Sequence, residues 1–96
     1  MTKEEKIKDN EYRVLRLSLA FENYEDNGRD TSMPLFDEII NDVNNYRRTR
    51  AENSIDKRIE LSDKILDKYN KLLDIVGREN FIIYDYGNID YIWKDN

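Results

Sequence analysis

Two carboxylates near the C-terminus, Asp85 and Asp90, are the residues of this sequence best spaced for joint chemistry. They flank the pair Gly87-Asn88, where the chain can reverse because glycine adopts positive φ freely. Folded there, two strands would bring the carboxylates directly opposite each other, where like charges repel. The pair could then contact a basic partner, or hold a cation with a third oxygen ligand. It could also lie at a solvated tip and repel weakly, and a one-residue register slip would separate it.

The run around these carboxylates, residues 80–93, is the longest window rich in β-branched and aromatic residues. It predicts a hairpin with strands over 80–86 and 89–94, which needs a helical layer or a third strand for stability. Tyr and Trp often dominate the energetics of protein interfaces. The aromatic face of the hairpin therefore either binds a partner or packs on the protein's own helices. The predicted partner-binding residues are Tyr84, Tyr86, Tyr91, Trp93, Asp85 and Asp90.

The tightest basic cluster is formed by Arg47, Arg48 and Arg50. Cations of this kind supply most of the affinity of proteins for the phosphates of nucleic acids. With Lys57 and Arg58, the cluster is the alternative candidate site, for nucleic acid. The same arginines also suit the C-terminal end of a helix, where positive charge is favourable.

Histidine and cysteine are absent, which removes the commonest general base and the thiol nucleophile. The three glycines lie far apart, so no phosphate-binding loop is expected. The loop before Gly28 is similar in composition to a calcium loop, but Pro34 stands where a bidentate Glu is required. We therefore expect a protein that is not an enzyme and holds no cofactor or metal.

The chain has 96 residues, which predicts a single domain over 1–96 with one modest core. It carries 16 Lys and Arg against 21 Asp and Glu, a net charge of −5. Such an acidic surface suits a basic protein partner better than nucleic acid. No apolar run is long enough for a membrane span and the N-terminus opens no signal segment, so we expect no membrane contact and a cytoplasmic protein.

The first part of the chain contains one ambiguous segment. Thr2 and Glu5 have the spacing of a capping box, so a helix is expected to begin at Lys3. Residues 15–22 alternate between apolar and polar as a strand does, although Val14, Leu17, Phe21 and Tyr24 also follow helical 3-4-3 spacing. We predict a short helix and then a strand over 12–22 that pairs with the hairpin.

Two long helices are predicted between the ambiguous segment and the hairpin. The first covers about 33–50, with Ser32 as its N-cap. The second covers about 54–76, from a cap at Ser54 to a stop at Gly77. Its apolar residues follow a heptad-like seam, which could form the core or a homodimer interface.

These elements predict an α+β fold in which the two long helices, about 33–50 and 54–76, cover a small antiparallel sheet. The sheet would contain the strands over 80–86 and 89–94 and the strand over 12–22. The element order resembles that of a winged helix, in architecture only. The third helix is longer than a recognition helix, and the hairpin carries aromatic residues and aspartates where a wing normally carries cations.

Three functions are compatible with the sequence. The first is a small acidic, non-enzymatic protein that binds and occludes a macromolecule, as an inhibitor, immunity or accessory protein does, with a basic protein as its partner. The second is a winged-helix-like protein that binds DNA, or an accessory protein of a mobile element, through the basic cluster at 47–58. The third is a structural homodimer formed through the long helix.

Overall fold

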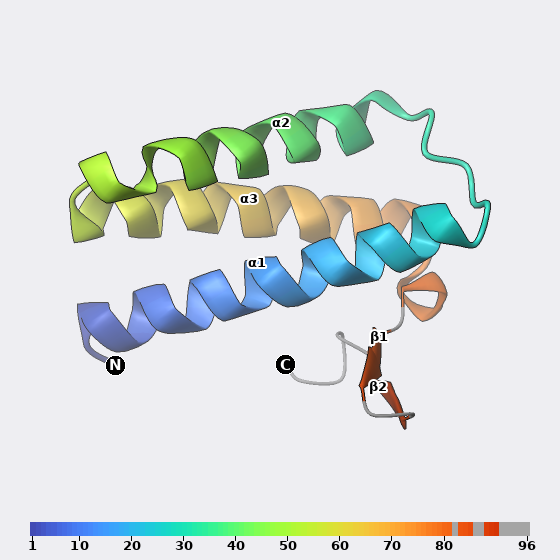
Figure 1. Cartoon of the computed structure of the whole chain (residues 1–96), viewed down its shortest axis with the longest axis horizontal. Helices are drawn as coiled ribbons and strands as arrows, with labels where there is room; N and C mark the ends of the chain where they lie inside the picture. The colour runs from blue at the N-terminus through green and yellow to red at the C-terminus, as the bar shows by residue number, and fades with distance from the viewer. Residues whose placement is uncertain (82, 86–87, 91–96) are drawn as a thin grey trace.

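The computed structural model describes residues 1–81 and the backbone of 83–85 and 88–90. Its main body consists of three long helices, α1 (Lys3–Asp26), α2 (Pro34–Thr49) and α3 (Ile55–Val76). Consecutive helices run in opposite directions and lie side by side (Figure 1). Two 3-10 turns, η1 (Arg50–Glu52) and η2 (Arg78–Asn80), follow α2 and α3. The described chain is therefore a three-helix bundle, and the predicted α+β fold is wrong.

Helix α1 begins where the sequence predicts but continues far beyond it. The Thr2 hydroxyl accepts a hydrogen bond from the Glu5 amide at 3.1 Å, and the Glu5 carboxylate accepts one from the Thr2 amide at 3.3 Å. This capping box satisfies two amides at the start of the helix. The helix then runs without interruption to Asp26, so the predicted strand over 12–22 is wrong.

Residues 12–22 form helix and not strand because of which of their apolar side chains are buried. Val14, Leu17 and Phe21 all lie in the shared core. Leu15 and Leu19, which complete the alternating pattern, are 50% and 44% exposed. The helical 3-4-3 spacing therefore determines the backbone, because it allows one face of α1 to pack on two other helices.

Helix α2 starts at Pro34, whose fixed φ suits the first helical position. Its N-cap is Met33, which makes no side-chain cap, so the predicted cap at Ser32 is wrong. The Ser32 amide instead donates to the Asp30 carboxylate at 2.9 Å. The predicted helix over 33–50 is otherwise confirmed within one residue at each end.

Helix α3 has the predicted bounds and local signals. The Ser54 hydroxyl accepts a hydrogen bond from the Lys57 amide at 3.2 Å, which caps the first turn. At the other end, Gly77 has φ of 100° and its amide donates to the Leu73 carbonyl. That left-handed conformation favours glycine, which ends the helix there.

The three helices share one apolar core, which Phe81 closes at the C-terminal end of α3. Phe81 is fully buried, and its ring centre lies 4.9 Å from Phe21 and 4.7 Å from Tyr24. Because the heptad-like seam of α3 supplies Ile65, Tyr69, Leu72 and Leu73 to this core, those residues pack within the chain. Remaining core members from α1 and α2 are Val14, Leu17, Ala20, Phe36, Ile39, Val43 and Tyr46.

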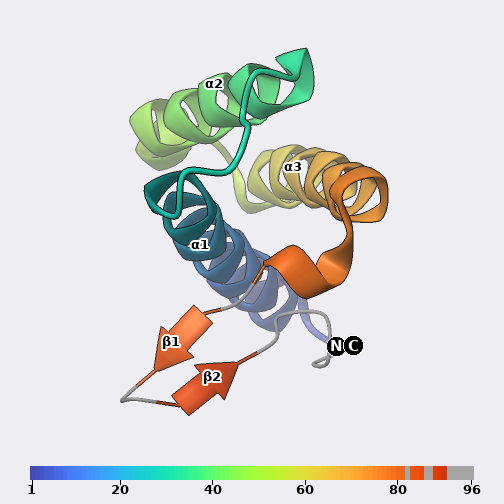
Figure 2. The same cartoon turned by 90° about the vertical axis from the view of Figure 1, so that its right-hand side faces the viewer.

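Two three-residue strands follow the bundle, β1 (Ile83–Asp85) and β2 (Asn88–Asp90). They pair antiparallel and lie below α1 in Figure 2. Asp85 is opposite Asn88 and Asp90 is opposite Ile83, so the predicted pairing of Asp85 with Asp90 is wrong.

The predicted hairpin of strands over 80–86 and 89–94 is therefore wrong in its register and at the start of its first strand, whereas residues 82, 86 and 91–94 of these strands lie outside the described residues. Asn80 belongs to η2, and no third strand occurs among the described residues. Without a helix-covered sheet, the winged-helix likeness is wrong as well. The long α1 takes the volume in which that sheet was expected.

Candidate functional site

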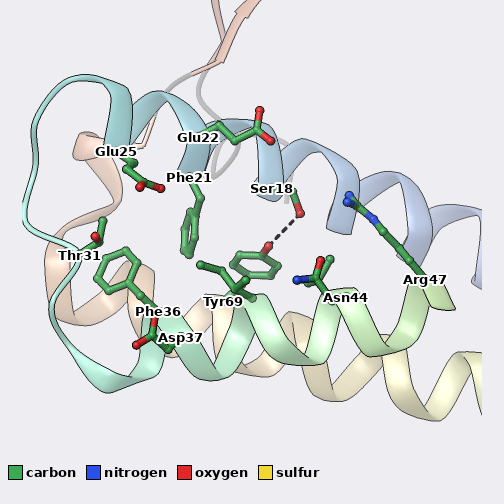
Figure 3. A pocket seen from close by; sticks show the side chains of 12 residues that line it. Ser18, Phe21, Glu22, Glu25, Thr31, Phe36, Asp37, Asn44, Arg47 and Tyr69 are labelled. Atoms are coloured by element: carbon green, nitrogen blue, oxygen red, sulfur yellow. Dashed lines mark hydrogen bonds between the residues drawn. The ribbon is translucent and has the colours of Figure 1, made fainter. Parts of the chain in front are cut away.

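A groove of about 320 Å³ lies between α1 and α2. Tyr69 of α3 forms part of its floor, and Thr31 of the connecting loop lies at one end (Figure 3). We call this feature the α1–α2 groove. From α1 it is lined by Ser18, Phe21, Glu22 and Glu25, and from α2 by Phe36, Asp37, Ile40, Val43, Asn44 and Arg47.

The floor of the α1–α2 groove is aromatic and uncharged. The ring of Phe21 lies with its centre 5.5 Å from Phe36, and it meets Tyr69 edge to face at 4.7 Å. The Tyr69 hydroxyl shares a hydrogen bond of 2.9 Å with the Ser18 hydroxyl. Burial raises the pKa of Tyr69, so the phenol keeps its proton at neutral pH. The floor therefore offers apolar surface whose polar atoms are already satisfied.

The residues that line the groove carry more negative than positive charge. Three carboxylates line it, Glu22, Glu25 and Asp37, against the single cation Arg47. Within the described part of the chain, none of these four side chains forms an ion pair with another. In Figure 3, Glu25 and Asp37 lie at the end near Thr31, and Arg47 lies at the opposite end. The groove is thus acidic at one end and basic at the other.

Exposed apolar side chains extend the groove onto the surface. Ile40 lines it and is 47% exposed. On α1, Leu15 and Leu19 are exposed and each lies three residues before a groove residue, Ser18 and Glu22. Side chains three apart on a helix are neighbours, so these leucines lie next to groove residues, although neither of them lines the groove itself. The available apolar surface is consequently larger than the groove itself.

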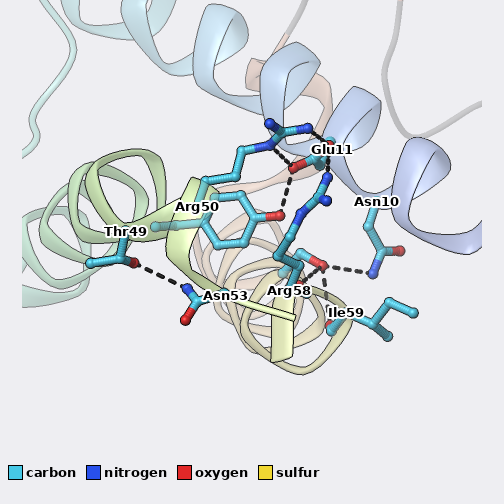
Figure 4. A network of polar contacts seen from close by, with 9 residues as sticks. Asn10, Glu11, Thr49, Arg50, Asn53, Arg58 and Ile59 are labelled. Carbon is cyan, nitrogen blue, oxygen red and sulfur yellow. Dashed lines mark hydrogen bonds and ion pairs between the residues drawn. The ribbon is translucent and has the colours of Figure 1, made fainter. Parts of the chain in front are cut away.

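Two cations of the predicted basic cluster, Arg50 and Arg58, are bound to a carboxylate of α1. Glu11 of α1 accepts hydrogen bonds from Arg50, Arg58 and the hydroxyl of Tyr46 (Figure 4). The two arginine contacts to its Oε1 are 3.0 Å long, and the tyrosine contact to Oε2 is 2.7 Å long. The hydrogen bond from Arg50 is the main cause that lowers the pKa of Glu11 to about 2, against an opposing effect of burial. Glu11 therefore remains ionised and links α1 to α2, η1 and α3.

The five cations proposed for nucleic acid have different neighbours in the structure. Arg50 and Arg58 are bound to Glu11, whereas Arg47 lies in the α1–α2 groove. Arg48 donates to the side chain of Asn45 at 2.7 Å, and Lys57 pairs with Glu60 at 3.7 Å. A phosphate surface needs several cations that are free to release counterions together.

The residues proposed for partner binding lie mostly beyond what the structure describes. Tyr86, Tyr91 and Trp93 are outside the described residues. Tyr84, Asp85 and Asp90 are described only by their backbone, in β1 and β2. Their role as a binding surface stays a prediction, without the opposed carboxylate pair on which it partly depended.

Sequence reasoning missed the α1–α2 groove because it placed a strand where α1 continues. A signal for the groove was nevertheless present. Ser18, Glu22 and Glu25 repeat at 4-3 spacing beside the apolar stripe, which on a helix makes one polar edge. Only the length of α1 makes that edge face α2.

Among the described residues, no group of three or more His, Cys, Asp or Glu side chains is placed to hold a metal ion. No described helix is long and apolar enough to cross a membrane. The chain matches no protein-family model, no curated protein and no solved structure. The α1–α2 groove is consequently a candidate site on the grounds of its geometry and charge alone.

Proposed function

We propose that this chain is a non-enzymatic protein that binds another macromolecule, and that the α1–α2 groove is its contact surface. The observation that carries the proposal is the combination of an aromatic floor with exposed apolar borders. Phe21, Phe36 and Tyr69 form the floor, and Ile40 remains 47% exposed at its edge. The floor itself is already buried, at 9% exposure or less, so a partner would gain apolar contact chiefly at Ile40, and burial of apolar surface is the main driving force of association.

A macromolecule fits this surface better than a small molecule does. The volume of about 320 Å³ is near the lower limit of ligand pockets, roughly 300 Å³. The apolar surface continues outside the groove through Leu15 and Leu19. A partner that covers both the groove and its borders would bury more area than a ligand confined to the groove. Occlusion of that partner, as by an inhibitor, immunity or accessory protein, is the corresponding mode of action.

The two alternative functions gain less support from the geometry. Nucleic-acid binding through Arg50 and Arg58 would compete with Glu11 for these cations. Homodimer formation through the seam of α3 would require residues such as Ile65 and Leu72 to leave the core. Each alternative therefore acts against contacts that stabilise the bundle.

Site-specific photo-crosslinking in extracts of the native host tests this proposal. A photoreactive side chain at Ile40 should give a discrete adduct with a second macromolecule. The matched control is Ile75, which is 61% exposed on α3 and does not line the groove. The same adducts from both positions, or none from Ile40, would contradict the proposed contact surface.

A further inference from the structure

We infer that the occupant of the α1–α2 groove is a basic amphipathic helix of a partner protein, which docks parallel to α2. This inference rests on the proposed function and specifies its partner. It follows from three properties of the groove: the excess of carboxylates, the position of two of them at one end, and the length of the groove.

The excess of carboxylates determines the sign of the partner's charge. Glu22, Glu25 and Asp37 face the groove without an ion pair among the described residues. Carboxylates at the contact between α2 and α3 are paired, since Glu38 and Asp42 both bind Lys68. Basic side chains on a partner would supply the missing cations, and opposite charges across an interface favour both encounter and orientation.

The position of the charges determines the direction of the docked helix. Glu25 and Asp37 lie at the end where α2 begins, and Arg47 lies where α2 ends (Figure 3). A helix carries partial positive charge at its N-terminus and partial negative charge at its C-terminus. The favourable direction places the partner's N-terminus near Glu25 and Asp37 and its C-terminus near Arg47. That direction is parallel to α2 and antiparallel to α1.

The length of the groove determines the size of the docked segment. From Asp37 to Arg47, α2 advances about 15 Å at 1.5 Å per residue. A partner helix of about three turns therefore spans the groove. Its apolar residues would recur at i, i+3 or i+4, and i+7, so that one stripe contacts Ile40 and the exposed edge of Phe21. With this helix in place, the three-helix bundle becomes a four-helix arrangement.

A displayed library of helical peptides of about 14 residues provides the test. Each peptide has Leu at i, i+3 or i+4, and i+7, with Lys, Glu or Ala varied at the other positions. Selection on the whole chain should enrich Lys in the first turns and Glu in the last turn. The enriched peptide should bind at least about tenfold tighter than the peptide of the same composition with its charges reversed end to end.

Two charge variants of the protein separate the groove from general charge effects. Glu22→Lys with Glu25→Lys should weaken the enriched peptide by about tenfold or more. Glu52→Lys with Asp67→Lys changes the net charge equally at exposed positions outside the groove and should leave binding unchanged. Circular dichroism of both variants establishes that the bundle is intact.

Three results would overturn the inference. They are equal affinity of the forward and reversed peptides, equal weakening in both charge variants, and no enrichment over peptides with scrambled Leu spacing. Self-association of the chain that Ile40→Lys abolishes would also overturn it, because the occupant would then be a second copy. A discrete crosslink from Ile40 despite these results would leave the proposed function standing, whereas absence of that crosslink contradicts the function itself.

Discussion

The two halves of α1 use charge in opposite ways. In the first half, Asn10 donates 2.9 Å hydrogen bonds to Ser62 and Asp63, and Glu11 binds Arg50 and Arg58. In the second half, Glu22 and Glu25 face the α1–α2 groove without an ion pair among the described residues. One helix thus closes the bundle at one end and offers an acidic, partly apolar surface at the other.

The largest effect expected from this contrast comes from two adjacent isoleucines of α2. Ile39 is fully buried in the core, whereas Ile40 is 47% exposed at the groove. Ile39→Ala should reduce the free energy of unfolding by about 3 kcal/mol, because it leaves a cavity. Ile40→Ala should change it by about 0.5 kcal/mol or less, because little burial is lost and Ala favours the helix. Urea unfolding of both variants measures the difference, and equal losses would mean that Ile40 belongs to the core.

A smaller loss is expected when the network around Glu11 is broken. Glu11→Gln should lower the free energy of unfolding by about 2 kcal/mol, since Arg58 is left partly buried without its carboxylate. The expected loss is below that of a fully buried pair because water reaches both side chains. Glu22→Gln, at the open groove, should cause no loss in the same urea experiment. A loss of similar size from both substitutions would remove the distinction between the two halves of α1.

Low pH should remove the difference in stability between the wild type and Glu11→Gln. The pKa of Glu11 is lowered from 4.5 to about 2, chiefly by the hydrogen bond from Arg50. Its stabilising contribution is therefore complete above pH 4.5 and is lost as the pH falls from there toward 2. The difference in unfolding free energy between the wild type and Glu11→Gln should shrink over that range. A difference that stays constant down to about pH 2 would argue against the ionised network.

The smallest expected effect concerns the groove floor. Ser18→Ala removes the hydrogen bond of 2.9 Å to Tyr69 and should cost about 1 kcal/mol of stability. The control Ser32→Ala, at an exposed loop position outside the groove, should cost less. Thermal unfolding of both variants distinguishes them. No loss from Ser18→Ala would mean that water replaces the bond and that the groove floor is already solvated.

Much of the helical structure was predictable because its signals are local. The capping box of Thr2 and Glu5, the Ser54 cap and the Gly77 stop each involve residues within four positions of one another. The segment 12–22 was not predictable in this way, because its apolar residues fit both a strand and a helix. For the run after Phe81, β-branched and aromatic composition predicts long strands, and within the described residues β1 and β2 contain three residues each.

The candidate site was less predictable than the helices. Its residues come from α1, the connecting loop, α2 and α3, so no local pattern joins them. The basic cluster was visible in the sequence, but its partner Glu11 lies 39 residues from Arg50 and 47 from Arg58. Arginines that look available in the sequence can thus be paired in the fold. Glu22 and Glu25, which the sequence does not single out, instead line a groove without an ion pair among the described residues.

The sequence by itself determined where most helices start and stop, since caps, proline and glycine act through neighbours along the chain. Only the tertiary structure decided that α1 runs on through Tyr24, because burying one face of it against α2 and α3 outweighs an ambiguous local pattern. Tertiary packing likewise decided which charges are paired. Coulombic contacts depend on distance in space, and the fold brings cations to Glu11 but not, among the described residues, to Glu22 and Glu25.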